Sequence, residues 1–219
     1  MIKVTQLSYS YGSKKVLEDI NFTVGQGEKC ALIGRNGAGK STLIKLMLNM
    51  EKTKKGTVSF NEQSNQQESW KTFVSYLPEK FKLYQSLTPI ENLVFFNRLN
   101  PTQQPIEKIE SILKQVSLFE DKDTPIHQFS KGMLQRLGLA MILLFDTDII
   151  ILDEPTSGLD PIGRNEILSL IKQMEDKTVL LSSHHFEEVK EICTHVLMLE
   201  DGHISKMDIA TFEHQYIRG

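Results

Sequence analysis

The sequence has few cysteines, and this shortage restricts what the protein can be. Of its 219 residues only two are cysteine, Cys30 and Cys193, which is too few for a disulfide-stabilised scaffold. Cys30 stands in an apolar strand pattern and Cys193 in a helical pattern, so we expect two buried free thiols that pack as small apolar side chains. This cysteine usage is typical of a reducing compartment.

Long apolar runs are also missing. No stretch approaches the roughly 20 apolar residues that span a bilayer. The longest runs, LAMILLF and DIIILDEP, are short and are followed or ended by acids. The first residues, MIKVTQLSYSYG, lack the apolar segment of a signal peptide. We therefore expect the chain to reach a membrane only through a partner chain.

The sequence carries no excess of positive charge. Its formal net charge is -3, whereas a general nucleic-acid binder is more often basic, so nucleic acid is not an expected partner. Internal repeats, low-complexity segments and heptad runs are missing as well. The content of 40% hydrophobic and 24% charged residues is that of an ordinary globular domain, and the length suits one large domain with a subdomain.

The order of apolar patterns predicts an α/β fold. Residues 2–24 are β-rich, EKCALIG is a short apolar strand of the kind buried on both faces, and STLIKLMLNM continues as a helix. From about residue 89 to 118 the pattern is helical, and after it short apolar strands again alternate with helices, which predicts a largely parallel sheet. We expect one domain over residues 1–219, with core segments at about 1–79 and 146–219 and a helical subdomain at about 80–145.

The strongest motif is a phosphate-binding loop at residues 34–41. Its sequence, GRNGAGKS, fits the pattern G-x-x-x-x-G-K-[ST] and lies between the strand and the helix that such a loop requires. Glycines let backbone N–H groups wrap a phosphate, and the helix N-terminus adds partial positive charge. Lys40 can reach the β- and γ-phosphates, and the Ser41 hydroxyl can hold Mg²⁺. The expected nucleotide contacts are Asn36, Gly37, Ala38, Gly39, Lys40, Ser41 and Thr42.

Two further strand ends carry ionisable side chains. Asp153 ends the buried strand IIILD, where its carboxylate can hold Mg²⁺ through water. Glu154 follows at once and is a candidate general base for water; we expect it to point elsewhere because side chains alternate along a strand. His184 follows the strand VLLSS, which we expect beside the phosphate-loop strand, so it is a candidate γ-phosphate sensor. By the same alternation, we expect His185 to point away and to be structural.

The segment FSKGMLQR, residues 129–136, opens an apolar helix but offers no obvious nucleophile, metal ligand or base. With the motifs above, it makes nearly the whole chain resemble the ATP-binding-cassette (ABC) ATPases. That family has a Ser-x-Gly turn before its second acidic strand, as Ser130-Lys131-Gly132 stands here. LDEPTSGLD and SSH match its acidic strand and its switch histidine, and Tyr11 occupies the place of the aromatic residue that stacks on adenine.

The resemblance implies a P-loop ABC-ATPase fold with a mainly parallel core sheet, an antiparallel β subdomain and an inserted helical subdomain. It implies an ATPase that binds ATP and Mg²⁺, with Lys40, Glu154 and His184 in catalysis. It further implies that the ATPase belongs to a transporter with a separate transmembrane permease and lies on the cytoplasmic face of the cell membrane.

The family also pairs two such domains head to tail. Ser130 and Gly132 would then contact the partner chain's ATP, and Asp160 would lie at the same interface. The resemblance leaves open whether the second ATPase subunit is identical.

Two positions depart from the commonest family pattern. Lys131 adds a cation to the Ser-x-Gly turn, and it can face phosphate or solvent. Glu79, in YLPEK, stands where the family usually has Gln; a carboxylate there can hold Mg²⁺ or orient water, but it adds negative charge. Both departures are similar to the branch that powers exporters of drugs, antimicrobial peptides, antibiotics or polysaccharides.

The loop that leads into the helical segment holds three apolar residues, Phe81, Leu83 and Tyr84. They can belong to the core of the helical subdomain or form a cleft for a short helix of the permease. The alternative to transport is a single ABC ATPase that acts on ribosomes or nucleic acid, which the acidic composition disfavours.

Overall fold

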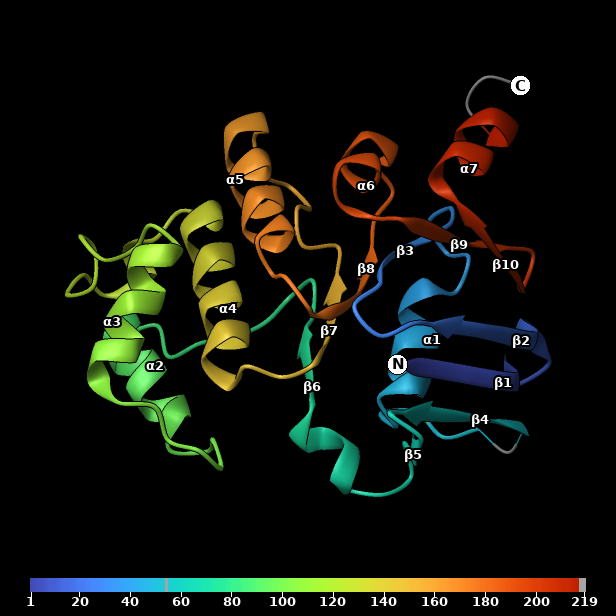
Figure 1. Ribbon diagram of the computed structural model, residues 1–219, viewed down its shortest axis with the longest axis horizontal. Coiled ribbons are helices and arrows are strands. Elements are labelled where there is room, and N and C mark those ends of the chain that lie inside the picture. Colours follow the sequence, from blue (N-terminus) through green and yellow to red (C-terminus); the bar gives the residue numbers. More distant parts are fainter. Residues whose placement is uncertain (54, 217–219) are drawn as a thin grey trace.

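The computed structural model describes residues 1–53 and 55–216 as two sheets with helices around them (Figure 1). The strands are β1 Ile2–Tyr11, β2 Lys14–Val24, β3 Lys29–Ile33, β4 Lys55–Phe60, β5 Gln63–Ser64, β6 Val74–Leu77, β7 Ile149–Asp153, β8 Thr178–Ser182, β9 His195–Glu200 and β10 His203–Asp208. The helices are α1 Lys40–Met47, α2 Pro89–Asn97, α3 Ile106–Gln115, α4 Lys131–Phe145, α5 Pro161–Lys172, α6 Phe186–Ile192 and α7 Ile209–Tyr216, with short 3₁₀ helices η1 Ser69–Thr72 and η2 Ile126–Gln128.

The larger sheet has the strand order β10-β9-β3-β8-β7-β6. Its strands are parallel except at the β10–β9 edge, where the pairing is antiparallel. β7 and β8 are buried along their whole length because both faces of the sheet are covered, which explains their continuous apolar sequences. The predicted mainly parallel sheet is confirmed, and the strand before His184, β8, pairs with the phosphate-loop strand β3 as expected.

The smaller sheet has the order β2-β1-β4-β5, and all of its pairs are antiparallel. Buried and exposed positions alternate along β2, so one face of this sheet packs on the interior while the other meets solvent. In Figure 1 this sheet and helices α2, α3 and α4 lie at opposite ends of the molecule, with the larger sheet between them.

Two hydrophobic cores lie on the two faces of the larger sheet. Ile150 and Leu152 of β7 face the core that contains the buried side chains of α3, α4 and α5. Ile149 and Ile151 of the same strand face the core built from α1 and the smaller sheet. Because side chains alternate along a strand, the five residues of β7 contribute to both hydrophobic cores.

The inserted helices share the first of these cores. α2 begins at a capping box in which the Thr88 hydroxyl accepts from the Glu91 backbone N–H, while Glu91 accepts from that of Thr88. α4 approaches the sheet closely at Gly138, where an added Cβ would lie 2.7 Å from Phe81 Cζ and 2.9 Å from Leu77 Cδ1. Helices α2, α3 and α4 fall within the range 80–145 that we propose for the helical subdomain.

The two cysteines are buried and free, as expected. Burial raises the pKa of the Cys30 thiol to about 12 and raises the pKa of the Cys193 thiol as well. Cys193 follows directly after α6 instead of lying inside the helix. No described helix has both the length and the apolar character that crossing a bilayer requires.

Candidate functional site at the phosphate loop

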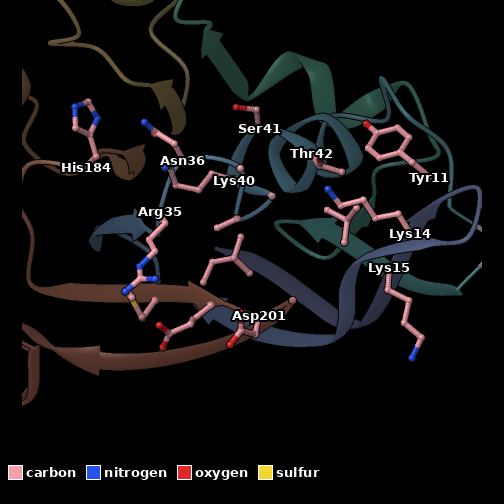
Figure 2. A pocket seen from close by; sticks show the side chains of 18 of the residues that line it. Tyr11, Lys14, Lys15, Arg35, Asn36, Lys40, Ser41, Thr42, His184 and Asp201 are labelled. Carbon is pink, nitrogen blue, oxygen red and sulfur yellow. The ribbon is translucent and has the colours of Figure 1, made fainter.

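A cavity of about 920 Å³ opens over the loop that follows β3 (Figure 2). Its walls are this loop with the start of α1, the β1–β2 turn, the β9–β10 turn, and side chains from the loops after β6, β7 and β8. Eleven of the expected site residues line it: Tyr11, Asn36, Gly37, Ala38, Gly39, Lys40, Ser41, Thr42, Glu79, Glu154 and His184. The volume is in the range of small-molecule sites, about 300–1,000 Å³.

The backbone of the loop needs its glycines. Gly37 and Gly39 have φ of 83° and 109°, a region that L side chains rarely adopt. A Cβ on Gly34 would lie 2.6 Å from the carbonyl oxygen of Leu199, so the close approach of the loop to β9 also requires glycine. α1 starts at Lys40 without a side-chain cap on Gly39, which leaves its first N–H groups for a ligand.

Lys40 is buried at the base of the cavity. Its Nζ donates to the carbonyl oxygen of Gly34 at 2.7 Å and lies 3.7 Å from Oε1 of Glu154. The ammonium therefore sits between the phosphate loop and an acid from another strand. A buried lysine held in this way is a preorganised cation for a ligand phosphate.

Glu154 lies just beyond β7, and its direction has a different cause from the one expected. The residue has φ of 49°, in the left-handed region, so the turn and not strand alternation directs its side chain. Its N–H donates to Ser182 Oγ at 2.8 Å. Its Oε2 lies 2.8 Å from Nδ1 of His184, so one carboxylate links Lys40 and His184.

Asp153 is buried next to this pair but is not among the described residues that line the cavity. The Ser182 hydroxyl donates to its Oδ1 at 2.6 Å. Ser182, at the end of β8, thus donates to one acid and accepts from the backbone of the next, and so it holds both acids at the end of the neighbouring strand β7. Sequence reasoning missed Ser182, because its two partners lie on the neighbouring strand and no local pattern links them to it.

The expectation that His185 points away from His184 is wrong. The centroids of the two imidazole rings are 4.0 Å apart with an interplanar angle of 42°. Both residues follow β8, which ends at Ser182, so the period-2 rule of a strand does not apply to them. In Figure 2 the His184 side chain lies across the cavity from Tyr11, with Lys40 and Ser41 between them.

Two expected residues lie toward the rim of the cavity. Glu79 follows β6, is exposed, and accepts a hydrogen bond from Ser157 Oγ at 3.4 Å. Tyr11 ends β1 and is about half exposed, and its ring meets Tyr9 edge to face at 4.9 Å between centroids. Several cavity-lining residues were not expected, among them Lys14, Lys15, Arg35 and Ser157.

The Ser-x-Gly turn lies outside this cavity, as does Asp160, when the described lining residues are considered. Ser130 caps α4, with its Oγ accepting from Met133 N at 3.2 Å, and Gly132 is in the first turn of that helix. Asp160 caps α5 in the same way through Gly163 N at 2.8 Å. The structure therefore does not bring these residues to the phosphate loop of their own chain.

The sequence left open whether Lys131 faces phosphate or solvent, and the structure shows a further contact. The Lys131 side chain is exposed, yet its ammonium lies over the backbone of Gly158, where an added Cβ would collide with Lys131 Nζ. The cation therefore packs on the loop that follows Glu154 in its own chain.

This fold and this cavity define a nucleotide-binding protein of the phosphate-loop class. A profile of the ABC transporter family matches residues 17–157. The lantibiotic transport ATP-binding protein SrtF of Streptococcus pyogenes is 33% identical over 206 residues, which cover 93% of this chain and 89% of SrtF. The bacitracin transport ATP-binding protein BcrA of Bacillus licheniformis is 34% identical over 220 residues, covering 98% of this chain and 71% of BcrA.

A solved structure gives the same result. CbiO1 of Clostridium perfringens, described as part of the ABC transporter complex CbiONQ, is 25% identical with a TM-score of 0.83, covering 99% of this chain and 96% of that one. The chain belongs to the ABC transporter family, and within it to the subunits that bind and hydrolyse ATP.

Proposed function

We propose that this ATPase subunit powers the export of antimicrobial peptides or related antibiotics through a separate membrane permease. The names of SrtF and BcrA support this cargo class, since both proteins are similar over at least 93% of the chain. The sequence supports it independently through Glu79 and the FSKGMLQRL segment, the two departures that resemble the exporter branch. The subunit would act on the cytoplasmic face of the membrane, where it meets ATP and the permease.

The observation that carries the proposed chemistry is the contact of Glu154 with both Lys40 and His184 at the phosphate loop. In our proposal Tyr11 stacks on adenine, the N–H groups from Asn36 to Thr42 bind phosphate oxygens, and Lys40 contacts the β- and γ-phosphates. Glu154 accepts a proton from the water that attacks the γ-phosphorus. His184, held by Glu154, then contacts the γ-phosphate.

The donor set around the cavity fits Mg²⁺. Ser41, Glu79 and Asp153 supply hydroxyl and carboxylate oxygens, the hard ligands that this ion prefers, and Mg²⁺ commonly binds one or two carboxylates together with substrate phosphates. We propose these three residues as its protein ligands, Asp153 through water. Bound there, the ion would neutralise charge on the β- and γ-phosphate oxygens.

We further propose that two ATPase subunits meet head to tail. Ser130 and Gly132 lie at an exposed helix start away from their own phosphate loop, where their hydroxyl and N–H groups are available to a second chain's γ-phosphate. Asp160 caps a second exposed helix start and is proposed for the same interface.

The surface proposed for the permease is a cluster of aromatic rings on the helical subdomain. Tyr84 packs edge to face on Phe95 at 4.7 Å and lies 6.0 Å from Phe96, and the first two rings are more than a third exposed. Phe81 and Leu83, by contrast, pack against the hydrophobic core. We therefore assign Phe81 and Leu83 to the core, keep the docking interpretation for Tyr84, and extend it to Phe95, which contacts Tyr84.

The proposal is tested in a bacterium that carries the gene, by placing Lys40→Ala on the chromosome. Loss of the phosphate-contacting cation should lower turnover of the purified chain by about 100-fold or more, and the cells should become more sensitive to a lantibiotic or to bacitracin. Arg98→Ala, an exposed change in the helical subdomain, is the control. Normal turnover in Lys40→Ala would refute the assigned site, and lost turnover with unchanged sensitivity to both compounds would refute the cargo class.

A further inference from the structure

Two carboxylates are buried among the described residues, Asp153 and Glu188, and only the first belongs to the site already proposed. Glu188 is in the first turn of α6 and is 5% exposed. Burying a carboxylate without partners costs free energy, so the partners of Glu188 indicate which segments it holds together.

Glu188 has three partners on three different segments. Thr156 Oγ1 donates to its Oε2 at 2.6 Å, and Ser183 Oγ donates to the same oxygen at 3.3 Å. Arg164 Nε forms an ion pair with its Oε1 at 3.1 Å. Thr156 and Ser183 are themselves 1% exposed, so the two hydroxyl contacts are shielded from water.

Each partner lies next to a residue of the proposed site. Thr156 is two residues after Glu154, in the loop that ends at Asp160. Ser183 directly precedes His184, and its Oγ also accepts from the N–H of His185 at 3.0 Å. Arg164 is in the first turn of α5, the helix that Asp160 caps. One buried carboxylate therefore joins the Glu154 loop, the His184 loop and the start of α5.

We propose that Glu188 is a positioning residue for ATP hydrolysis, which acts through Thr156 and Ser183 to hold Glu154 and His184 in contact. The inference rests on the catalytic roles proposed for those two residues. Neither loop is held by regular secondary structure at the site: Glu154 lies after the end of β7 and His184 after the end of β8. The 2.8 Å contact between Glu154 and His184 forms only if the two loops stay at a fixed distance from each other. Glu188 binds both loops, through Thr156 in one and Ser183 in the other.

Glu188 touches no part of the nucleotide cavity, because neither it nor its three partners is among the described lining residues. The positioning role therefore makes a different prediction from a purely structural one. Loss of positioning lowers the turnover number while ATP affinity stays the same, since the phosphate loop is untouched. Loss of folded protein lowers the active fraction and leaves the turnover of the remaining molecules unchanged.

The experiment compares Thr156→Val, which keeps shape but removes the hydroxyl, with Thr156→Ser, which keeps the hydroxyl. Glu188→Gln tests the charge, and Glu187→Gln, an exposed acid in the same turn of α6, is the matched control. Each full-length variant is measured for kcat and KM with MgATP, for binding of a fluorescent ATP analogue, and for its folded fraction. We expect kcat per folded molecule to fall about 10- to 100-fold in Thr156→Val and Glu188→Gln, with KM and analogue affinity nearly unchanged, and Thr156→Ser and Glu187→Gln to stay near the parent.

Unchanged kcat per folded molecule in Thr156→Val and Glu188→Gln would overturn the inference, as would equal losses of kcat and analogue affinity. A failure of Thr156→Ser to restore kcat would also count against it, because that variant keeps the hydroxyl. Glu154→Gln, measured in the same assay, separates the inference from the proposed function. Full turnover in Glu154→Gln would refute the catalytic role of Glu154 itself, whereas its loss together with unchanged Thr156→Val refutes only the positioning role.

Discussion

At the scale of single residues, the site depends on a strained position. Glu154 adopts left-handed backbone angles, which cost a non-glycine residue about 1–2 kcal/mol. The hydrogen bond from its N–H to Ser182 Oγ and the contacts of its carboxylate with Lys40 and His184 offset this cost. The acid that we propose as the base is thus held in place by Ser182, a residue that does not line the cavity.

Ser182→Ala should therefore lower the stability of the fold. The serine is fully buried, and its removal takes a hydrogen-bond partner from both Asp153 and the N–H of Glu154. We expect the free energy of unfolding to fall by about 1–3 kcal/mol in urea denaturation. Ser205→Ala, an exposed change in β10, should stay within about 0.5 kcal/mol of the parent. Equal stabilities of the two variants would contradict the linking role of Ser182.

The sequence predicted residues whose position follows from a local motif, and it failed where two distant loops meet. The phosphate loop and the strand end at Asp153 follow from short patterns, because glycines and apolar runs determine them locally. The links from Ser182 to Asp153 and from Glu188 to Thr156 cross between strands and helices, so no spacing reveals them. The prediction for His185 failed because strand periodicity was extended beyond the end of the strand.

At the scale of elements, α4 packs closely against the end of β6 at Gly138. A Cβ on Gly138 would enter the space of Leu77 and Phe81. Leu77 ends β6, and Phe81 lies in the loop that follows, two residues after Glu79. The helix that starts at Ser130 is therefore in direct contact with the loop that lines the cavity through Glu79.

Gly138→Ala should destabilise the protein by overpacking this contact, by about 1–3 kcal/mol in chemical denaturation. Phe81→Leu creates space at the same point, so the double variant should be more stable than the sum of the two single effects predicts. Strictly additive effects would show that α4 and the loop do not share this contact.

Tyr84→Asp tests the element that we propose for the permease. Tyr84 is about half exposed, so a charge there should leave the circular dichroism and the ATP affinity of the isolated chain unchanged. Co-purification with the co-expressed permease should fall, because a carboxylate would have to be desolvated in an apolar interface. Tyr216→Asp, on an aromatic residue of similar exposure in α7, is the control. Co-purification that survives Tyr84→Asp would place the docking surface elsewhere.

At the scale of the whole molecule, the chain carries two exposed helix starts, and Ser130, Gly132 and Asp160 are not among the described residues that line the phosphate-loop cavity. The Ser-x-Gly turn starts α4, and Asp160 starts α5, while the phosphate loop starts α1 on the other side of β7 and β8 (Figure 1). If two chains close around ATP, as we propose, the start of α4 binds the γ-phosphate of the partner chain's ATP. This arrangement also explains why the turn contains no catalytic side chain, since a hydroxyl and backbone N–H groups suffice to bind a phosphate oxygen.

The most direct test of this account is the oligomeric state of Glu154→Gln by gel filtration with light scattering, with and without MgATP. The change removes the proposed base but keeps its shape, so bound ATP should persist and hold two chains together. We predict a dimer with MgATP and a monomer without it. Adding Ser130→Arg places a bulky cation where the partner's γ-phosphate should lie, so the double variant should stay monomeric while each chain still binds ATP. Loss of ATP binding by the monomeric double variant would contradict the account, because it would mean that the Ser-x-Gly turn serves its own chain.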